Sequence, residues 1–278
     1  MTSVFIQMLY GFRYSVSFVS LGMFLVSMLI IYIVDGIGGL EGVNEFMKMM
    51  PDGIKAMFKM DEGLSSVTGF IAVEYRDPGY FMIGLGFAIA IASGLVAREI
   101  ENGTILMFGA MPIKRWRYLL SKIAALVLGL LVVVIAAGLG TYIGSLLTNT
   151  TSDIDFTVIS LVLVNFLVLT LAVSGITAAL SSKLSSGGRT VSIAAAIMAV
   201  MYFIDLLSSL LDLISNIDFL SLFHYYDPGA ISNSGQLNLE HILVLLGITI
   251  ITYGLALYVY NKRAVSYTHL TLPTNREV

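Results

Sequence analysis

The sequence predicts an all-α, polytopic membrane protein with six transmembrane helices, and three observations carry that prediction. Of the 278 residues, 57% are hydrophobic and only 12% are charged, whereas soluble proteins carry about 25% charged residues. The apolar residues gather in runs of membrane-spanning length, roughly 20 residues each. The charged residues between these runs divide unequally between alternate loops, which indicates a fixed orientation in the membrane.

The N-terminal residues 1–17 predict an amphipathic surface helix ahead of the first span. Their apolar side chains recur at helical spacing, at Phe5, Leu9, Phe12 and Val16. A cleaved signal peptide is the competing interpretation. We favour a retained anchor, because Arg13 is the only basic residue before an apolar run that starts late, and no small-x-small cleavage site follows that run.

The six predicted spans belong to one membrane domain, residues 1–263. They cover about residues 18–34, 80–97, 119–143, 156–180, 191–208 and 241–260. Residues 35–79 form an outer segment with one or two short amphipathic helices. Short outer-leaflet helices are expected before the sixth span, ending in a turn at Asp227-Pro228-Gly229. Residues 264–278 are polar and resemble adaptor-derived tails, so we interpret them as non-native.

Three features inside these segments invite more than one interpretation. The second span is rich in glycine, alanine and serine, which predicts close helix packing in lipid. Asn165, near the middle of the fourth span, needs a hydrogen-bond partner, either on a neighbouring helix or along a translocation path. Five methionines of the outer segment suit either a Cu(I) site or adaptable apolar packing, and we favour packing; they are Met47, Met49, Met50, Met57 and Met60.

The distribution of charge predicts the orientation. Six spans place both termini on one side, together with ten basic residues, whereas four basic residues and fifteen acids fall on the other side. The ten are Arg13, Arg98, Lys114, Arg115, Arg117, Lys122, Lys183, Arg189, Lys262 and Arg263. Because positive loops stay in the cytosol, both termini are expected to be cytosolic.

The loop of residues 98–118, between the second and third spans, is the densest basic segment in the interior of the chain. We interpret it as a chain that leaves the membrane, forms a short helix at the cytosolic surface and re-enters. Gly103-Thr104 suits a break followed by a helix N-cap. Pro112 suits the first position of a second helical piece. Trp116 and Tyr118 suit the headgroup level of the membrane.

This loop resembles the corresponding loop in the permease subunits of type-two ATP-binding-cassette (ABC) exporters. The matching positions are Glu99, Glu101, Gly103, Thr104, Pro112, Arg115 and Lys122. The resemblance implies that the loop is a coupling helix that docks on a separate ATPase subunit. Leu106 stands where many members carry an acid, and Lys114 where a small hydroxyl residue is common, which bears on the choice of ATPase partner. The alternative is an ordinary positive loop.

The resemblance also implies partners and a location. A second permease copy, identical or not, would complete the export pathway in a prokaryotic plasma membrane. ATP and Mg²⁺ would be bound by the ATPase, with no cofactor in this chain, which lacks the Gly-x-x-x-x-Gly-Lys phosphate loop. There is no cysteine, no His-Glu-x-x-His motif and no metal-ligand spacing among three histidines. We therefore expect no enzyme activity, and no nucleic-acid partner, since no basic surface remains.

Two other functions stay open at this point. One is a membrane immunity or sensor subunit that has the same architecture but moves no substrate. The other is a secondary transporter, which the sequence disfavours because such proteins keep ionisable residues inside the membrane and no charged residue falls in the middle of a predicted span.

Overall fold

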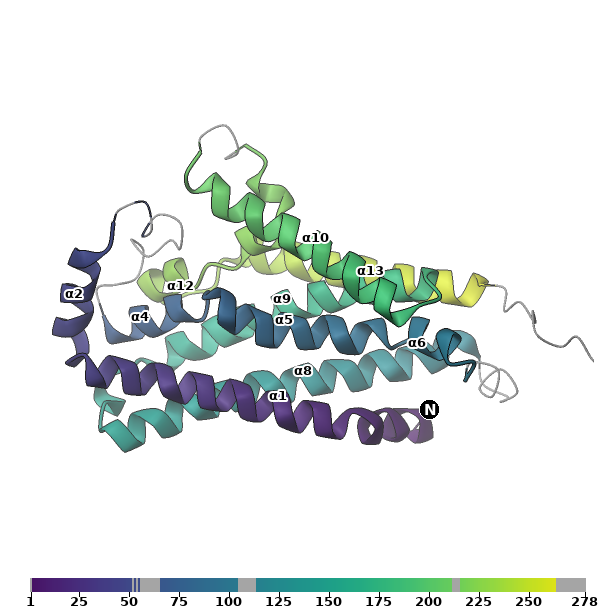
Figure 1. The fold of residues 1–278 in the computed structure, drawn as a ribbon, viewed down its shortest axis with the longest axis horizontal. Coiled ribbons are helices and arrows are strands. Elements are labelled where there is room, and N and C mark those ends of the chain that lie inside the picture. Colours follow the sequence, from purple (N-terminus) through teal and green to yellow (C-terminus); the bar gives the residue numbers. More distant parts are fainter. Residues whose placement is uncertain are drawn as a thin grey trace, which may run out of the picture.

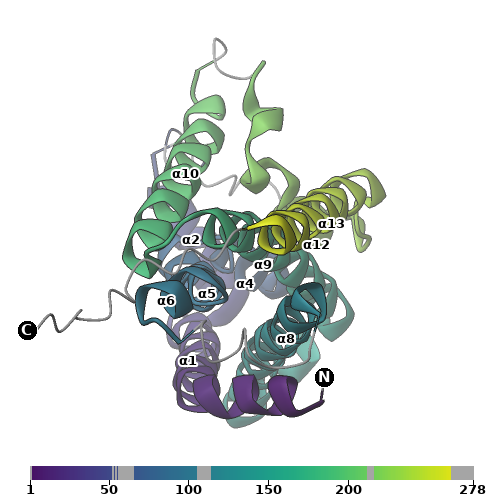
Figure 2. The same cartoon turned by 90° about the vertical axis from the view of Figure 1, so that its right-hand side faces the viewer.

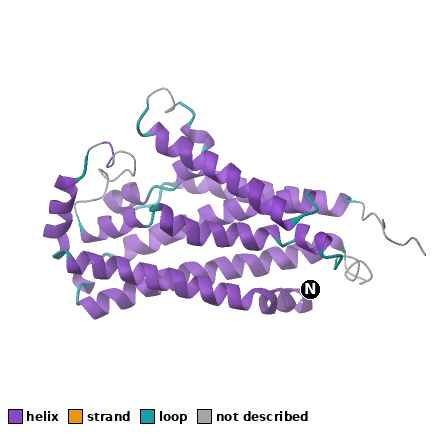
Figure 3. Cartoon of the chain, in the orientation of Figure 1, coloured by secondary structure: helices purple, strands orange, loops and turns teal. Residues whose placement is uncertain are grey.

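A computed structural model gives the fold for residues 2–51, 53, 55, 66–104, 114–211 and 216–263. Within these ranges the chain consists of helices and loops, without a strand (Figure 3). The predicted all-α class is therefore confirmed. Pro112 of the loop, most of residues 52–65 and the tail 264–278 lie outside the described residues.

Among the residues that the structure describes, five helices are long and apolar enough to cross a membrane, and they run lengthwise with α10 tilted away from the others (Figure 1). They are α1 (Thr2–Gly36), α8 (Arg115–Thr148), α9 (Phe156–Lys183), α10 (Gly187–Ser208) and α13 (Leu239–Lys262). These correspond to the first, third, fourth, fifth and sixth predicted spans; α1 also takes in the N-terminal segment, and the other four are extended by a few residues. The structure supports five of the six predicted spans as single helices.

The predicted second span differs, because its helix is shorter than the apolar run. The chain forms α4 (Val67–Glu74), α5 (Pro78–Ser93) and α6 (Ala97–Glu101) in succession. The 16 residues of α5 extend about 24 Å, less than the roughly 30 Å of a hydrocarbon core. We call the link Tyr75–Asp77 the Arg76 joint and the link Gly94–Val96 the Ser181 joint, after the side chains that hold them.

The predicted division of the N-terminus into a surface helix and a span is not a break in secondary structure. Residues Thr2–Gly36 form one continuous helix. Figure 2 shows, however, that the first turns of α1 run across the end of the bundle while the rest of the helix is seen end-on. Those turns expose Tyr10 and Tyr14, with the Arg13 guanidinium over both rings at 5.3 and 4.6 Å.

Glycines allow the helices to approach closely, as predicted for the second span. A Cβ built on Gly84 of α5 would lie 2.6 Å from the Phe166 ring of α9. On α8, a Cβ on Gly140 would lie 2.2 Å from the Phe24 carbonyl oxygen of α1, and Gly144 meets Ile31. Gly140 and Gly144, four residues apart on α8, therefore pack this helix against α1.

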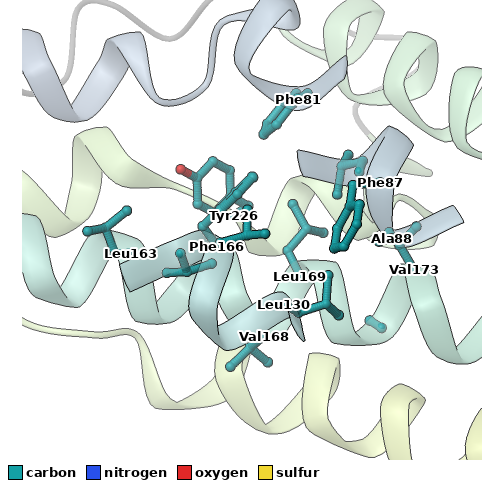
Figure 4. Close-up of a cluster of buried hydrophobic side chains, with 14 of the residues drawn as sticks. Phe81, Phe87, Ala88, Leu130, Leu163, Phe166, Val168, Leu169, Val173 and Tyr226 are labelled. Atoms are coloured by element: carbon teal, nitrogen blue, oxygen red, sulfur yellow. The ribbon is translucent and has the colours of Figure 1, made fainter. Parts of the chain in front are cut away.

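The core surrounds α9, which lies between α5, α8 and α13 (Figure 2). Phe166 of α9 is fully buried. Its ring lies 5.8 Å from Tyr226 and 6.2 Å from Phe81 of α5, measured between centroids (Figure 4). This aromatic cluster joins the central helix to the segment that precedes α13.

Short helices cap one end of the bundle. They are α2 (Gly39–Met49), η1 (Thr151–Asp153), η2 (Asp218–Leu220), η3 (Leu222–Tyr225) and α12 (Pro228–Ser234). Asp227-Pro228-Gly229, predicted as a turn, begins α12 instead, because the Asp227 carboxylate accepts the Ala230 N–H at 3.0 Å and Pro228 fits the first helical turn. Met49 of the methionine-rich segment is exposed, and Met57 and Met60 lie outside the described residues.

Candidate functional site

The Ser181 joint breaks the helix between α5 and α6 at the end of the bundle where the N-terminus lies (Figure 1). A break leaves backbone groups on both sides without partners inside the helix. Leu95 and Val96 are buried, so water cannot supply the missing hydrogen bonds.

The side chain of Ser181, from the last turn of α9, satisfies both sides of the break. Its Oγ accepts hydrogen bonds from the N–H groups of Val96 (3.1 Å) and Ala97 (3.0 Å) and donates to the Ser93 carbonyl oxygen (2.8 Å). One hydroxyl has one donor and two acceptor sites, so Ser181 is saturated. The joint is therefore a formed structure held from α9.

Lys122 of α8 holds the same joint from the other side. Its ammonium donates to the Leu95 carbonyl oxygen and lies 2.8 Å from Glu99 Oε1 of α6. The sequence placed Lys122 among the basic residues of the cytosolic side, and in the structure its side chain is only 4% exposed. Tyr118, one turn earlier on α8, donates its hydroxyl to the same Glu99 oxygen at 2.9 Å. Glu99 thus binds α6 to α8.

Glu101, at the end of α6, contacts the N-terminus of α10. Its carboxylate accepts the Gly187 N–H at 2.8 Å and the Ser186 hydroxyl at 2.9 Å. These two hydrogen bonds, the backbone one first, lower the pKa of Glu101 below its usual range. Gly187 permits the approach, because a Cβ there would lie 3.4 Å from Glu101 Oε2 and 3.3 Å from Arg98 Cβ.

Gly103 and Thr104 end this segment. Gly103 has a φ of +71°, a conformation that glycine adopts without strain, so the predicted break is at this residue. The Thr104 hydroxyl donates to the Glu99 carbonyl oxygen at 3.2 Å. Thr104 therefore binds the backbone of α6. The helix that Thr104 was predicted to cap would lie in residues 105–113, outside the described residues.

Arg115 is the first residue of α8 and binds the end of α13. Its Nη1 donates to the Arg263 carbonyl oxygen at 2.6 Å. The Arg263 guanidinium in turn donates to the carbonyl oxygens of Ser182 and Leu184, both at 2.8 Å, at the end of α9. The ends of α8, α9 and α13 are thus connected through two arginines.

The Arg76 joint, at the other end of α5, is held by a buried ion pair. Arg76 Nη2 lies 2.5 Å from Asp205 Oδ2 on α10, and both side chains are 6% exposed. The same guanidinium donates to the Tyr226 carbonyl oxygen, and the Tyr226 hydroxyl donates to the Tyr75 carbonyl oxygen at 3.2 Å. The pair lies at the ends of α5 and α10, so it leaves the expectation that no charged residue falls in the middle of a predicted span unchanged.

Sequence reasoning identified the two acids and Gly103 of this site but missed Ser181, Arg263 and the Ser186-Gly187 contact. Each missed residue lies about 80 positions or more from its partner, so no local spacing could reveal it. Asn165, whose partner the sequence left open, is buried and donates to the Tyr225 carbonyl oxygen at 3.3 Å.

Two comparisons relate this chain to known proteins. A family model described as "ABC-2 family transporter protein" matches residues 16–265. A stretch of 81 residues is 37% identical to the "Uncharacterized protein YhcI" of Bacillus subtilis (strain 168), covering 28% of this chain and 26% of that protein. The aligned stretch thus spans about a quarter of that relative. The family model, in contrast, covers most of the 278 residues of this chain. The chain therefore belongs to the ABC-2 family of transporter proteins and is a multi-pass membrane permease.

Proposed function

We propose that the chain is the permease subunit of an ABC exporter and that the loop 98–118 receives movement from a separate ATPase subunit. The observation that carries the proposal is the attachment of this loop to three helices. Its first residues are tied to α8 through Glu99 and to α10 through Glu101, and its last residues to α13 through Arg115. A displacement of the loop would therefore move these helices together as rigid bodies.

This arrangement assigns different roles to the predicted coupling residues. Glu99 and Glu101 act as internal anchors of the loop, because their carboxylates are engaged by groups of this chain. Gly103 directs the chain out of α6. Pro112 and the exposed Lys114 and Arg117 remain for contact with the ATPase, which would bind ATP and Mg²⁺.

The export path in this proposal follows the face shared by α5 and α10. An apolar groove of about 320 Å³ lies between these helices, lined among others by Phe81, Met82, Leu85, Met198 and Tyr202. Contacts that join α10 to the α4–α6 segment bracket the groove, Glu101–Gly187 at one end and Arg76–Asp205 at the other. Met82 is 78% exposed, so a second permease copy would close the groove. The lining suits lipophilic or amphiphilic cargo.

The topology in this proposal has six crossings with both termini in the cytosol of a prokaryotic cell, and α5 with its flanking joints forms the second. The chain contains no cysteine, so single cysteines can report their side of the membrane without background. A membrane-impermeant maleimide added to intact cells should label a cysteine at Ser152 and leave one at Ser185 unlabelled. The reverse pattern would overturn the orientation.

The experiment that tests the function is co-purification of the tagged chain in mild detergent, followed by mass spectrometry. A stoichiometric partner that carries a phosphate loop, and whose ATP hydrolysis changes on binding this chain, is the expected result. A monodisperse preparation with no such ATPase would contradict the proposal. Membership of the ABC-2 family favours a permease powered by a partner over a secondary transporter.

A further inference from the structure

A pocket of about 330 Å³ lies between the first turns of α1, the Ser181 joint and the start of α8. The part of its wall from α1 is mainly apolar, with Val4, Met8 and Phe12, and also carries the amide of Gln7. The opposite part carries Arg98 and Glu99 of α6 and Lys122 of α8. A cavity with an apolar wall on one side and a charged wall on the other matches an amphiphilic ligand.

The charged wall has one cationic and one acceptor group to offer. Lys122 is occupied by Glu99 and by the Leu95 carbonyl oxygen. Arg98 is exposed and makes no hydrogen bond or close ion pair with the residues that the structure describes, and its charge acts on the nearby Glu101 carboxylate without contacting it. The second oxygen of Glu99, Oε2, is buried and has no hydrogen-bond partner among those residues. A buried acceptor without a donor costs free energy, so a ligand that brings a donor is favoured.

The position of the pocket indicates the source of that ligand. The turns of α1 that form its apolar wall also expose Tyr10 and Tyr14, with the Arg13 guanidinium over both rings. Aromatic rings with a polar end and arginine are enriched at the headgroup level of a bilayer. The pocket therefore opens at the depth where the phosphate groups of one leaflet lie.

We propose that this pocket binds the headgroup of a membrane phospholipid that also carries a hydrogen-bond donor. The phosphate binds Arg98, whose guanidinium matches phosphate geometry. The ammonium of an ethanolamine or the hydroxyl of a glycerol headgroup donates to Glu99, and an acyl chain lies along Val4, Met8 and Phe12. Because Arg98 and Glu99 belong to α6, the bound lipid holds the loop 98–118 against α1.

Lipid binding to the delipidated full-length chain in detergent, measured by native mass spectrometry, tests this proposal. Phosphatidylethanolamine, phosphatidylglycerol and phosphatidylcholine with identical acyl chains are the probes. The choline headgroup keeps the phosphate but has no hydrogen-bond donor. Phosphatidylethanolamine, phosphatidylglycerol or both should therefore bind about tenfold tighter than phosphatidylcholine. Comparing phosphatidylethanolamine with phosphatidylglycerol distinguishes an ammonium donor from a hydroxyl donor. Equal binding of all three, or of none, would overturn the proposal. Soluble glycerophosphoethanolamine should not compete, and competition by it at the lipid's own affinity would exclude a lipid site.

Two variants with matched controls locate the site. Gly11→Leu fills the pocket, since Gly11 lines it and a Cβ there meets nothing within 4 Å, and it should abolish binding. Gly22→Leu makes the same change on α1 away from the pocket, where a Cβ is equally free, and should retain it. Arg98→Gln should weaken binding about tenfold, whereas Arg117→Gln, which removes an exposed charge outside the pocket, should not. Unchanged binding in both Gly11→Leu and Arg98→Gln would refute the assignment.

Discussion

The two joints at the ends of α5 solve the same problem with different chemistry. At the Ser181 joint, a neutral hydroxyl from α9 satisfies the broken backbone, with Lys122 of α8 beside it. At the Arg76 joint, the Arg76 guanidinium holds the turn by pairing with Asp205 of α10 and by donating to the Tyr226 carbonyl oxygen, which lies between η3 and α12. The first joint fixes α5 to the central helices, and the second fixes it to the helix that borders the groove.

The difference has a consequence for movement. Both ends of α10 are attached to the α4–α6 segment. Gly187, the first residue of α10, donates to Glu101 of α6, and Asp205, near the last residue of α10, pairs with Arg76. A force on α6 would therefore shift α5 and α10 together. The joints can be broken separately, and the expected losses differ in size.

Asp205→Ala should give the largest loss of stability, because it leaves the Arg76 guanidinium buried without a carboxylate. Removing one partner of a buried ion pair costs about 3–5 kcal/mol, measured by denaturant unfolding in mild detergent. The double variant Arg76→Met/Asp205→Leu removes both charges and should unfold within about 1 kcal/mol of the wild type, or be more stable. An unchanged unfolding midpoint for Asp205→Ala would show that the pair does not hold the joint.

Ser181→Ala should give an intermediate loss. It leaves the Val96 and Ala97 N–H groups without their partner in a buried place, at a cost of about 1–3 kcal/mol. Ser182→Ala is the matched control, since Ser182 is equally buried but its hydroxyl donates only to Ala178 in its own helix. Equal losses for the two variants, compared by thermal unfolding, would argue against a special role of Ser181.

Gly103→Ala should cost less, about 1–2 kcal/mol, because φ is +71° there and a left-handed conformation strains a residue with a Cβ. A Cβ at this position meets nothing within 4 Å, so conformational strain is the whole effect. Gly103→Asn should recover part of the loss, since asparagine tolerates this conformation better. Thermal midpoints of the three proteins provide the comparison, and a wild-type midpoint for Gly103→Ala would contradict it.

The Glu101 contact should give the smallest effect on stability and should depend on pH. The pKa of Glu101 is lowered in the folded chain by the Gly187 N–H and then by the Ser186 hydroxyl. Its contribution is therefore fully present above the ordinary glutamate pKa of 4.5 and is lost as the pH falls through the lowered folded value. Wild type and Glu101→Gln should differ in thermal midpoint at pH 7 and converge at low pH. A difference that grows on acidification would be the wrong sign.

The sequence predicted the long helices well because each carries an apolar run bounded by polar residues. It did not predict the Ser181 joint, since the residues around Gly94 stay apolar and the groups that satisfy the break come from α8 and α9. Lys122 follows a basic cluster and was counted with it, and no local pattern indicates that tertiary packing buries it against Glu99. Gly103 was predictable because its role depends on its own backbone.

The most direct test of the account is whether movement of the loop reaches α10 through Glu101. Spin labels on the exposed positions Ile193 of α10 and Leu128 of α8, in the complex with the ATPase, would report the distance between the helices with and without ATP. We predict an ATP-dependent shift in the wild type and in Glu240→Ala, a control on α13. In Glu101→Ala we predict a clearly smaller shift although the ATPase stays bound, because the contact with Gly187 is lost while the Arg76–Asp205 pair still links α10 to the α4–α6 segment. A wild-type shift in Glu101→Ala would contradict the account.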